Sequence, residues 1–360
     1  MYNWQHKNWP EFTFDSSSID NVLMKFMLKA GELKGIISAL PEVISTETII
    51  QIMVSEAIKT SEIEGEIINR TDVISSIRKN LGLPISKEPI DKNAIGLSQL
   101  IIDVRNTYRQ PLTESKILEW HKLLMGNNRR INAGQWRKGT EPMQVISGSA
   151  SNPKVHFEAP PSKNISKEMK RFIEWYNKSE ISSPIIKAAV AHLYFESIHP
   201  FEDGNGRIGR AIAEKALSQG FDHPIMFSIS KSIEENRSAY YIALQNAQQK
   251  LDLTKWIQWF ASIIIFAQDE AEKTIQFTVK KVKFFDKYDK NFNERQRKVI
   301  NRILEEGFNG FKGGMNVKKY ISITGTSKAT ATRDLQELTE MNVFLMKGAG
   351  RATSYQINSL

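Results

Sequence analysis

A short glycine-containing turn between two helical patterns is the feature that most restricts what this chain can fold into. The patterns cover residues 185–197 and 207–218. The turn lies within residues 199–210, which read His-Pro-Phe-Glu-Asp-Gly-Asn-Gly-Arg-Ile-Gly-Arg. Glycine lets a backbone approach an anion closely, and a helix that begins at such a turn directs several N–H groups at one point. The segment therefore predicts two helices joined at an anion site.

The side chains of residues 199–210 supply the other parts that phosphate-group transfer needs. His199 is a candidate base, because an imidazole takes up a proton near neutral pH. Asp203 offers an oxygen ligand to Mg²⁺, which usually takes one or two carboxylates and completes its octahedron with water and phosphates. Arg207 and Arg210 add permanent positive charge.

The segment resembles the signature loop of the Fic (fido) family, His-x-Phe-x-Asp/Glu-Gly-Asn-Gly-Arg-x-x-Arg, with every specified position filled. The resemblance implies a protein adenylyltransferase, which transfers AMP from ATP to a hydroxyl of a target protein or of itself. It implies that His199 is the base, that Asp203 binds Mg²⁺ and that Arg210 holds mainly the γ-phosphate. The nucleotide-binding residues on this interpretation are Gly204, Asn205, Gly206, Arg207, Ile208, Gly209 and Arg210.

A second motif ends a long helical pattern in the N-terminal part. Residues 60–65, Thr-Ser-Glu-Ile-Glu-Gly, resemble the inhibitory motif of the same family, Ser/Thr-x-x-x-Glu-Gly/Asn. The resemblance implies that Glu64 pairs with Arg210 and keeps the γ-phosphate from its productive position. ATP must break such a pair before its phosphate can use the same donors. The alternative from the residues alone is that Glu62, Glu64 and Glu66 solvate a helix end.

Two other site types are disfavoured by their context. The spacing Gly204-x-Gly206-x-x-Gly209 also matches the dinucleotide fingerprint, but that motif needs a preceding buried strand, and residues 185–197 have a helical pattern. The histidines outside the loop show no metal-ligand spacing, which argues against zinc.

A tyrosine pair downstream of the loop is the third part of the expected site. Residues 240–244 match a Tyr-Tyr-x-x-Leu pattern that is common at this place in the family. Tyr241 is the candidate nucleoside contact. Tyr240 is less favoured, because adjacent helical residues point about 100° apart. The alternative is that both tyrosines belong to the core.

Composition limits the class of protein more than its activity. The chain of 360 residues has no cysteine, which excludes disulfides, thiol catalysis and cysteine-based zinc sites. The N-terminal residues lack the apolar core of a signal peptide, and no apolar run reaches membrane-spanning length. We expect a cytoplasmic protein without membrane contact. Its formal charge of +9 suits phosphate-bearing or acidic partners.

We expect a mainly α fold in three regions. Residues 1–95 form a helical region with the inhibitory helix, and their first aromatic side chains dock on the body. Residues 96–288 form the Fic domain, a helical bundle. Within it, residues 145–157 predict a β-hairpin. The resemblance implies that this hairpin is a flap, which presents the target by pairing with its backbone.

Residues 289–360 are expected to form a small C-terminal domain. Two helical patterns, a turn at residues 324–326, a further helical pattern at 327–340 and a glycine-tipped hairpin resemble a winged helix-turn-helix. Ser327 is a candidate N-cap. The side chains expected to face a DNA groove are Lys328, Thr330, Thr332 and Arg333. A protein-docking or homodimerisation module is the alternative.

Two classes of function therefore compete. The favoured one is an adenylyltransferase that uses ATP and Mg²⁺, is inhibited by Glu64 and modifies a Ser, Thr or Tyr hydroxyl. The other is a transcriptional regulator that senses a nucleotide and binds DNA through the C-terminal domain. His199 disfavours the second, since sensing needs no base. Removal of AMP, with Glu64 positioning a water, is a further enzymatic alternative.

Overall fold

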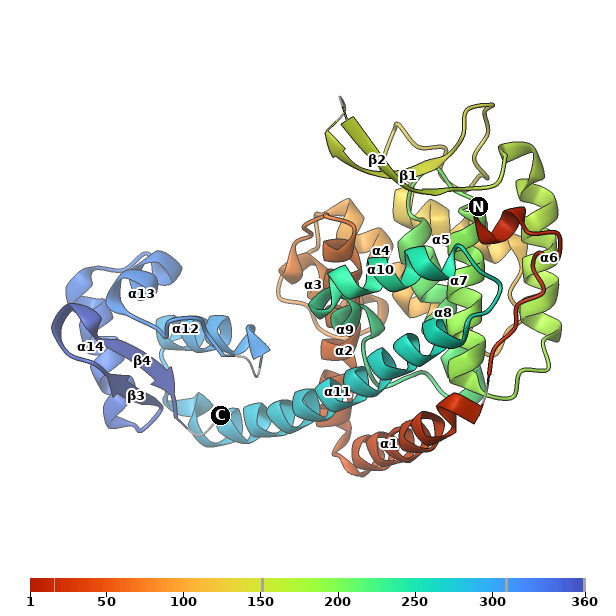
Figure 1. Ribbon diagram of the computed structural model, residues 1–360. Helices are drawn as coiled ribbons and strands as arrows, with labels where there is room; N and C mark the ends of the chain where they lie inside the picture. Colours follow the sequence, from red (N-terminus) through yellow and green to blue (C-terminus); the bar gives the residue numbers. More distant parts are fainter. Residues whose placement is uncertain (16, 150–151, 308–309, 359–360) are drawn as a thin grey trace. The chain divides into compact units, whose positions relative to one another are not determined.

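The computed structural model describes residues 1–15, 17–149, 152–307 and 310–358. The chain is mainly helical with small two-stranded sheets, which confirms the predicted fold class (Figure 1). It divides into two compact units. The larger contains Met1–Ser38 and Ile49–Ala271, and the smaller contains Ala39–Thr48 and Glu272–Leu360.

The α-helices and strands of the described residues follow one another in a simple order, with one hairpin in each unit. The helices are α1 Asp20–Ala39, α2 Glu42–Ile63, α3 Arg70–Asn80, α4 Lys92–Asn106, α5 Glu114–Met125, α6 Ile165–Lys178, α7 Pro184–Ile198, α8 Asn205–Phe221, α9 Ile229–Glu235, α10 Arg237–Ala247, α11 Thr254–Tyr288, α12 Glu294–Leu304, α13 Val317–Thr324 and α14 Lys328–Glu340. The strands are β1 Gln144–Ser149, β2 Asn152–Glu158, β3 Phe344–Lys347 and β4 Ser354–Ile357.

Helices α7 and α8 pack against each other inside the larger unit (Figure 1). Ser183 caps α7 by accepting a hydrogen bond from the backbone of Ile186, and Pro184 occupies the first helical position. From Ile185 onward nearly every residue of α7 is buried. A helix that is apolar on all sides lies within a core, so α7 holds its C-terminal end in a fixed place.

The N-terminal segment docks on the larger unit through its aromatic side chains, as predicted. The indole of Trp4 donates a hydrogen bond to the carbonyl of Glu158 at 2.7 Å. The rings of Trp9 and Phe12 contact the ring of Tyr194 edge-on, with centroids 5.1 and 5.3 Å away. Burying a large aromatic side chain contributes about 1.5–3 kcal/mol, so the segment is part of the fold.

The predicted hairpin is confirmed as β1 and β2, which pair antiparallel from Gln144 with Glu158 to Ser149 with Asn152. The register shifts between Val145 and Ile146, which marks a bulge. Residues 150–151, at the tip of the predicted turn, lie outside the described residues. The side chain of Ile146 is 57% exposed, so this hairpin carries apolar surface toward solvent.

The smaller unit has the predicted order of helices, turn and hairpin. Gly325, at φ 72°, ends α13, and Ser327 caps α14 by accepting from the backbone of Thr330 at 3.2 Å. Strands β3 and β4 pair antiparallel after α14. A common core joins α12, α13, α14 and both strands. Its assignment as a winged helix-turn-helix stays a prediction.

Within the described ranges, no helix combines the length and the apolar character that crossing a membrane requires.

Candidate active site

The loop of residues 199–204 joins α7 to α8, and the side chain of Asn205 holds its backbone. His199 ends α7 in the left-handed conformation, at φ 49° and ψ 61°, and Gly204 precedes α8 at φ 85°. The side-chain amide of Asn205 donates to the carbonyl of Phe201 and accepts from its N–H, each at 2.9 Å. This two-way clamp fixes the loop, so the C-terminal end of α7 and the N-terminal end of α8 face one site.

His199 is buried and has the properties of a neutral base. Burial, together with the positive charge of Arg137, lowers the pKa of His199 to about 4. Its Nδ1 has no hydrogen-bond partner among the described residues, and the Oε2 of Glu196 lies 3.7 Å away. The imidazole is therefore uncharged at neutral pH and can accept a proton.

Arg137 holds this loop in place, although the sequence analysis did not identify it. Its Nε donates to the carbonyl of His199 at 2.8 Å. Its Nη2 donates to the carbonyl of Pro160 at 2.5 Å, and its Nη1 donates to the hydroxyl of Ser162 at 2.9 Å. Burial lowers the pKa of Arg137 to about 10, which leaves it charged at neutral pH. A buried arginine thus holds the backbone of His199 and also fixes the chain after β2.

His121 is a second positioning residue that the spacing of histidines does not reveal. Its ring stacks on Phe201 with centroids 3.8 Å apart. The N–H of Gly134 donates to its Nδ1 at 2.9 Å, so its Nε2 carries the proton and donates to the carbonyl of Asp203 at 3.1 Å. Burial lowers the pKa of His121 to about 4, which keeps it neutral.

The carboxylate of Asp203 is well placed for a metal ion that arrives with phosphates. Its side chain is 48% exposed. Its Oδ1 accepts from the N–H of Gly204 at 2.5 Å and lies 3.4 Å from the Nη2 of Arg207. In the part of the chain that the structure describes, no three His, Cys, Asp or Glu residues form a metal-binding group. A single accessible carboxylate fits Mg²⁺, which fills its other positions with water and phosphates.

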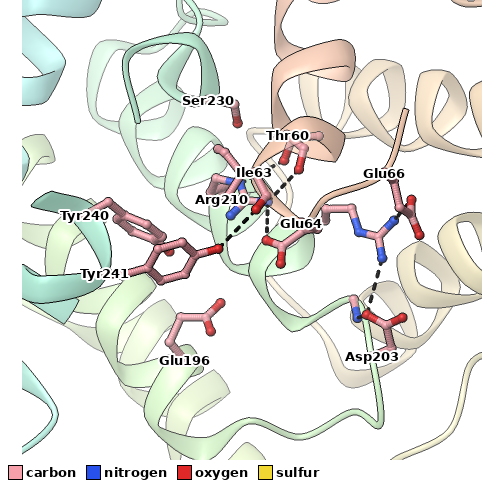
Figure 2. Close-up of polar contacts among 12 residues, drawn as sticks. Thr60, Ile63, Glu64, Glu66, Glu196, Asp203, Arg210, Ser230, Tyr240 and Tyr241 are labelled. Atoms are coloured by element: carbon pink, nitrogen blue, oxygen red, sulfur yellow. Dashed lines mark hydrogen bonds and ion pairs between the residues drawn. The ribbon is translucent and has the colours of Figure 1, made fainter. Parts of the chain in front are cut away.

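The two arginines of α8 are paired with carboxylates that follow α2 directly. The Nη2 of Arg210 donates to the Oε1 of Glu64 at 2.7 Å, and its Nε donates to the hydroxyl of Thr60 at 2.8 Å (Figure 2). The Nη1 of Arg207 donates to the Oε2 of Glu66 at 2.5 Å. The predicted pair of Glu64 and Arg210 is therefore present in the structure.

Gly206 explains how Glu64 reaches the first turn of α8. A Cβ atom on Gly206 would lie 2.1 Å from the Oε1 of Glu64, closer than real Cβ contacts come. The bare α-carbon thus leaves room for one carboxylate oxygen above the helix N-terminus.

Of the other residues predicted to bind the nucleotide, Ile208 is buried in the core and Gly209 faces Glu196 on α7. Their side-chain positions are used for packing between helices.

The two tyrosines of α10 differ in burial and in hydrogen-bond partner, although their rings lie side by side with centroids 5.1 Å apart. That only one of them contacts the nucleoside stays a prediction. Tyr240 is buried, and its hydroxyl lies 3.0 Å from the Nε2 of His192. Tyr241 is 40% exposed, and its hydroxyl donates to the carbonyl of Ile63 at 3.1 Å (Figure 2). Tyr240 is therefore a core residue, which was the alternative for both tyrosines. Tyr241 instead contacts the end of α2, next to Glu64.

Comparisons with known proteins match two parts of the chain. One family model, described as a domain of unknown function (DUF4172), matches residues 2–83, and the model of the Fic/DOC family matches residues 111–217. Among curated relatives, the protein adenylyltransferase Fic of Drosophila erecta is 31% identical over 166 residues, which cover 46% of this chain and 29% of the relative. The protein adenylyltransferase Fic of Nematostella vectensis is 26% identical over 209 residues, which cover 56% of this chain and 44% of the relative. The chain thus spans less than half the length of these relatives.

Solved structures show the same fold at low sequence identity. A Fic family protein from Desulfovibrio desulfuricans G20 has a TM-score of 0.54 and 19% identity, with 98% of both chains covered. Fic-1 from C. elegans has a TM-score of 0.53 and 20% identity, covering 72% of this chain and 75% of that one. The match to the Fic/DOC family model assigns residues 111–217, which include the filled signature loop, to a Fic domain, and the solved structures show that the chain has the same fold.

Proposed function

We propose that this protein transfers AMP from ATP to a hydroxyl group of a protein. The observation that carries the proposal is the arrangement of the loop between α7 and α8. A buried, neutral His199 stands at one end, and the exposed carboxylate of Asp203 and the N-terminus of α8 stand at the other. A base, a metal ligand and an anion site within one clamped loop suit attack on a phosphate group.

The nucleotide phosphates would lie over the first turn of α8. The first backbone hydrogen bond of this helix runs from the N–H of Ile208 to the carbonyl of Gly204, so the N–H groups of Asn205 and Gly206 precede it. These N–H groups and the helix dipole favour an anion. Arg207 and Arg210 would hold the outer phosphates.

Asp203 would hold Mg²⁺ together with phosphate oxygens, and the ion, when bound, neutralises charge on the phosphates. The exposure of its carboxylate leaves room for this. His121 contributes by fixing the backbone of Asp203 through its carbonyl.

In the chemical step, the hydroxyl oxygen of the target forms a bond to the α-phosphorus of ATP. His199 takes the hydroxyl proton at a ring nitrogen. The bond from the α-phosphorus to the bridging oxygen breaks, and pyrophosphate leaves. Positioning of the two reactants and stabilisation of charge supply most of the rate. Arg137 keeps the base in position by holding the carbonyl of His199.

The resting state would be inhibited by Glu64. Arg210 is 1% exposed and donates to this carboxylate, so a γ-phosphate that needs the same donor must first displace Glu64. The target would pair its backbone with an edge of the β1–β2 hairpin, in the manner of strand addition. Pairing through backbone atoms would place a Ser, Thr or Tyr hydroxyl without strong dependence on neighbouring side chains.

The test is transfer of label from α-³²P-ATP and Mg²⁺ onto the protein itself and onto a cell lysate. We expect Glu64→Gly to raise the labelling and His199→Ala, introduced into that variant, to abolish it. Glu62→Gly is the matched control, because Glu62 lies in the same turn and contacts Lys59. No label should transfer from γ-³²P-ATP, since pyrophosphate carries that phosphorus away.

Other outcomes assign other functions. Absence of label in every variant, with ATP still bound, would contradict adenylyl transfer and favour a nucleotide-sensing protein. Wild-type protein that strips AMP from a lysate modified by the Glu64→Gly variant would assign the reverse reaction.

A further inference from the structure

Glu66 forms a second ion pair across the candidate nucleotide site. Its Oε2 lies 2.5 Å from the Nη1 of Arg207, and the side chain of Arg207 is only 3% exposed. The side chain of Glu66 is 39% exposed. The pair is thus buried on the side of the arginine and open to solvent on the side of the carboxylate, so Glu66 can leave without crossing the core.

The backbone after α2 presents Glu64 and Glu66 together. The N–H groups of both residues donate to the carbonyl of Ser61, at 3.0 and 2.9 Å. Gly65 between them has φ +80°, a conformation that favours glycine. The chain therefore turns back on the end of α2, and two carboxylates that are two residues apart reach the same face of α8.

Their partners are three residues apart on α8, which places Arg207 and Arg210 side by side on one helical face. Arg207 is nearer the start of the helix, and its Nη2 lies 3.4 Å from the Oδ1 of Asp203. Arg210 lies one turn deeper and contacts Glu64. A phosphate bound near Asp203 and the N-terminus of α8 would therefore contact Arg207. The terminal phosphate of a triphosphate would contact Arg210.

We propose that Glu66 is a second carboxylate that competes with phosphate, and that it weakens the binding of nucleoside diphosphates and triphosphates alike. The inference rests on the proposed nucleotide site. Glu66 occupies Arg207, which the β-phosphate needs, whereas Glu64 occupies Arg210, which the γ-phosphate needs. A diphosphate must displace Glu66 alone. A triphosphate must displace both carboxylates.

The experiment measures the affinities of Mg²⁺-ADP and Mg²⁺-ATP by titration calorimetry for the full chain and its variants. Glu66→Gln and Glu66→Ala should each tighten ADP binding by about fivefold, the scale of a partly exposed ion pair. Glu64→Ala should leave ADP affinity within about twofold and tighten ATP binding by a similar fivefold. In the double variant the two gains for ATP should multiply, because each carboxylate blocks a different arginine.

Two controls keep the result interpretable. Glu62→Ala removes a carboxylate from the same turn that pairs with Lys59 instead of the loop, and it should change neither affinity. Glu66→Gln keeps an oxygen acceptor for the buried Arg207, and its thermal unfolding is compared with that of wild type. A folded Glu66→Gln protein whose ADP affinity is unchanged or weaker overturns the inference.

The failure of this inference is distinguishable from the failure of the proposed function. If wild type binds ADP and ATP but only Glu64 variants alter either affinity, Glu66 is not a competitor and the nucleotide site stands. If neither nucleotide binds any variant, including the double one, both proposals fall. Absence of AMP transfer with the expected affinity changes overturns only the transfer reaction.

Discussion

The hydroxyl of Tyr241 donates a hydrogen bond of 3.1 Å to the carbonyl of Ile63, the last residue of α2. Glu64 follows directly and pairs with Arg210. The side chain that the sequence predicts as a nucleoside contact therefore also holds the backbone from which Glu64 extends. A nucleotide that drew Tyr241 away from Ile63 would loosen Glu64 at the same time.

Tyr241→Phe should raise adenylyl transfer. The change removes the hydrogen bond to Ile63 but keeps the ring, and a net loss of about 1 kcal/mol corresponds to roughly a fivefold shift in the inhibited state. Initial rates of labelling from α-³²P-ATP measure the effect. In a Glu64→Gly background the same change should have little effect, because the carboxylate is absent. A lower rate with weaker ATP binding in both backgrounds would instead mark the hydroxyl as a nucleoside contact.

The acid limb of the rate should report His199. Because burial and Arg137 lower the pKa of His199 to about 4, the base stays neutral well below the ordinary histidine range and loses activity only as pH falls toward that value. We expect kcat/KM of the Glu64→Gly variant to be flat from about pH 7.5 to 5.5. ATP affinity of the Glu64→Gly/His199→Ala protein, measured over the same range, corrects for titration of the nucleotide. A fall centred near pH 6.5 after that correction would contradict the lowered pKa.

The carboxyl group of Glu196, beside His199, limits the upper end of this pH range. Burial, with a contribution from Glu64, raises the pKa of Glu196 to about 8, and its Oε2 lies 3.7 Å from the Nδ1 of His199. Above that pH the carboxyl ionises and changes the charge beside the base. The Glu64→Gly variant lacks the contribution of Glu64, so Glu196 ionises at a lower pH in that variant, and the acid limb is measured well below neutral pH.

Gly209→Ala should destabilise the larger unit. A Cβ atom there would lie 2.6 Å from the Oε1 of Glu196 and 3.0 Å from the Nδ1 of His192, both buried on α7. Overpacking of this kind costs about 1–3 kcal/mol in the free energy of unfolding. Gly31→Ala is the matched control: no atom lies within 4 Å of its added Cβ in α1, so alanine should stabilise the helix by about 0.5–1 kcal/mol. Denaturant unfolding that moved the same way in both variants would refute the packing argument.

Asp334 should hold the smaller unit together above acid pH. Its carboxylate is 1% exposed and accepts from Arg295 at 2.8 and 3.0 Å and from the hydroxyl of Tyr320 at 2.9 Å. Burial opposes the charged form, but these bonds outweigh it and lower the pKa of Asp334. The stabilisation is therefore present above the ordinary aspartate pKa of about 3.9 and is lost as pH falls through the lower folded value.

Asp334→Asn should cost the smaller unit about 2–3 kcal/mol at pH 7 and much less near pH 2. All seven tryptophans lie in the larger unit, so their fluorescence follows that unit, whereas far-ultraviolet circular dichroism follows helices of both. We expect the dichroism transition to move and the fluorescence transition to stay. An equal loss at both pH values would show that the charge of Asp334 is not what matters.

Local features of the fold and site were predictable because their causes lie within a few residues. The helical pattern at residues 185–197, the glycine turn and the cap at Ser327 each depend on neighbouring side chains. The pair of Glu64 and Arg210 joins distant segments, and it was expected only through the resemblance to a family motif.

The positioning residues had no such signal. Arg137 gathers the carbonyl of His199, the carbonyl of Pro160 and the hydroxyl of Ser162, three acceptors that meet only after folding. His121 reaches Asp203 from α5 for the same reason. An isolated arginine or histidine has no spacing to mark it, so contacts of this range appear only in the folded chain.

The space above Gly206 holds one carboxylate oxygen, and that oxygen belongs to the same chain. Glu64 therefore acts there at an effective concentration that the fold sets. Diluting the protein does not weaken the contact of Glu64 with the site. The fraction of sites that Glu64 occupies depends on the concentration of a free competing anion relative to the effective concentration of Glu64. A site built this way would respond to the concentration of a competing anion, and its response would not depend on the concentration of the protein.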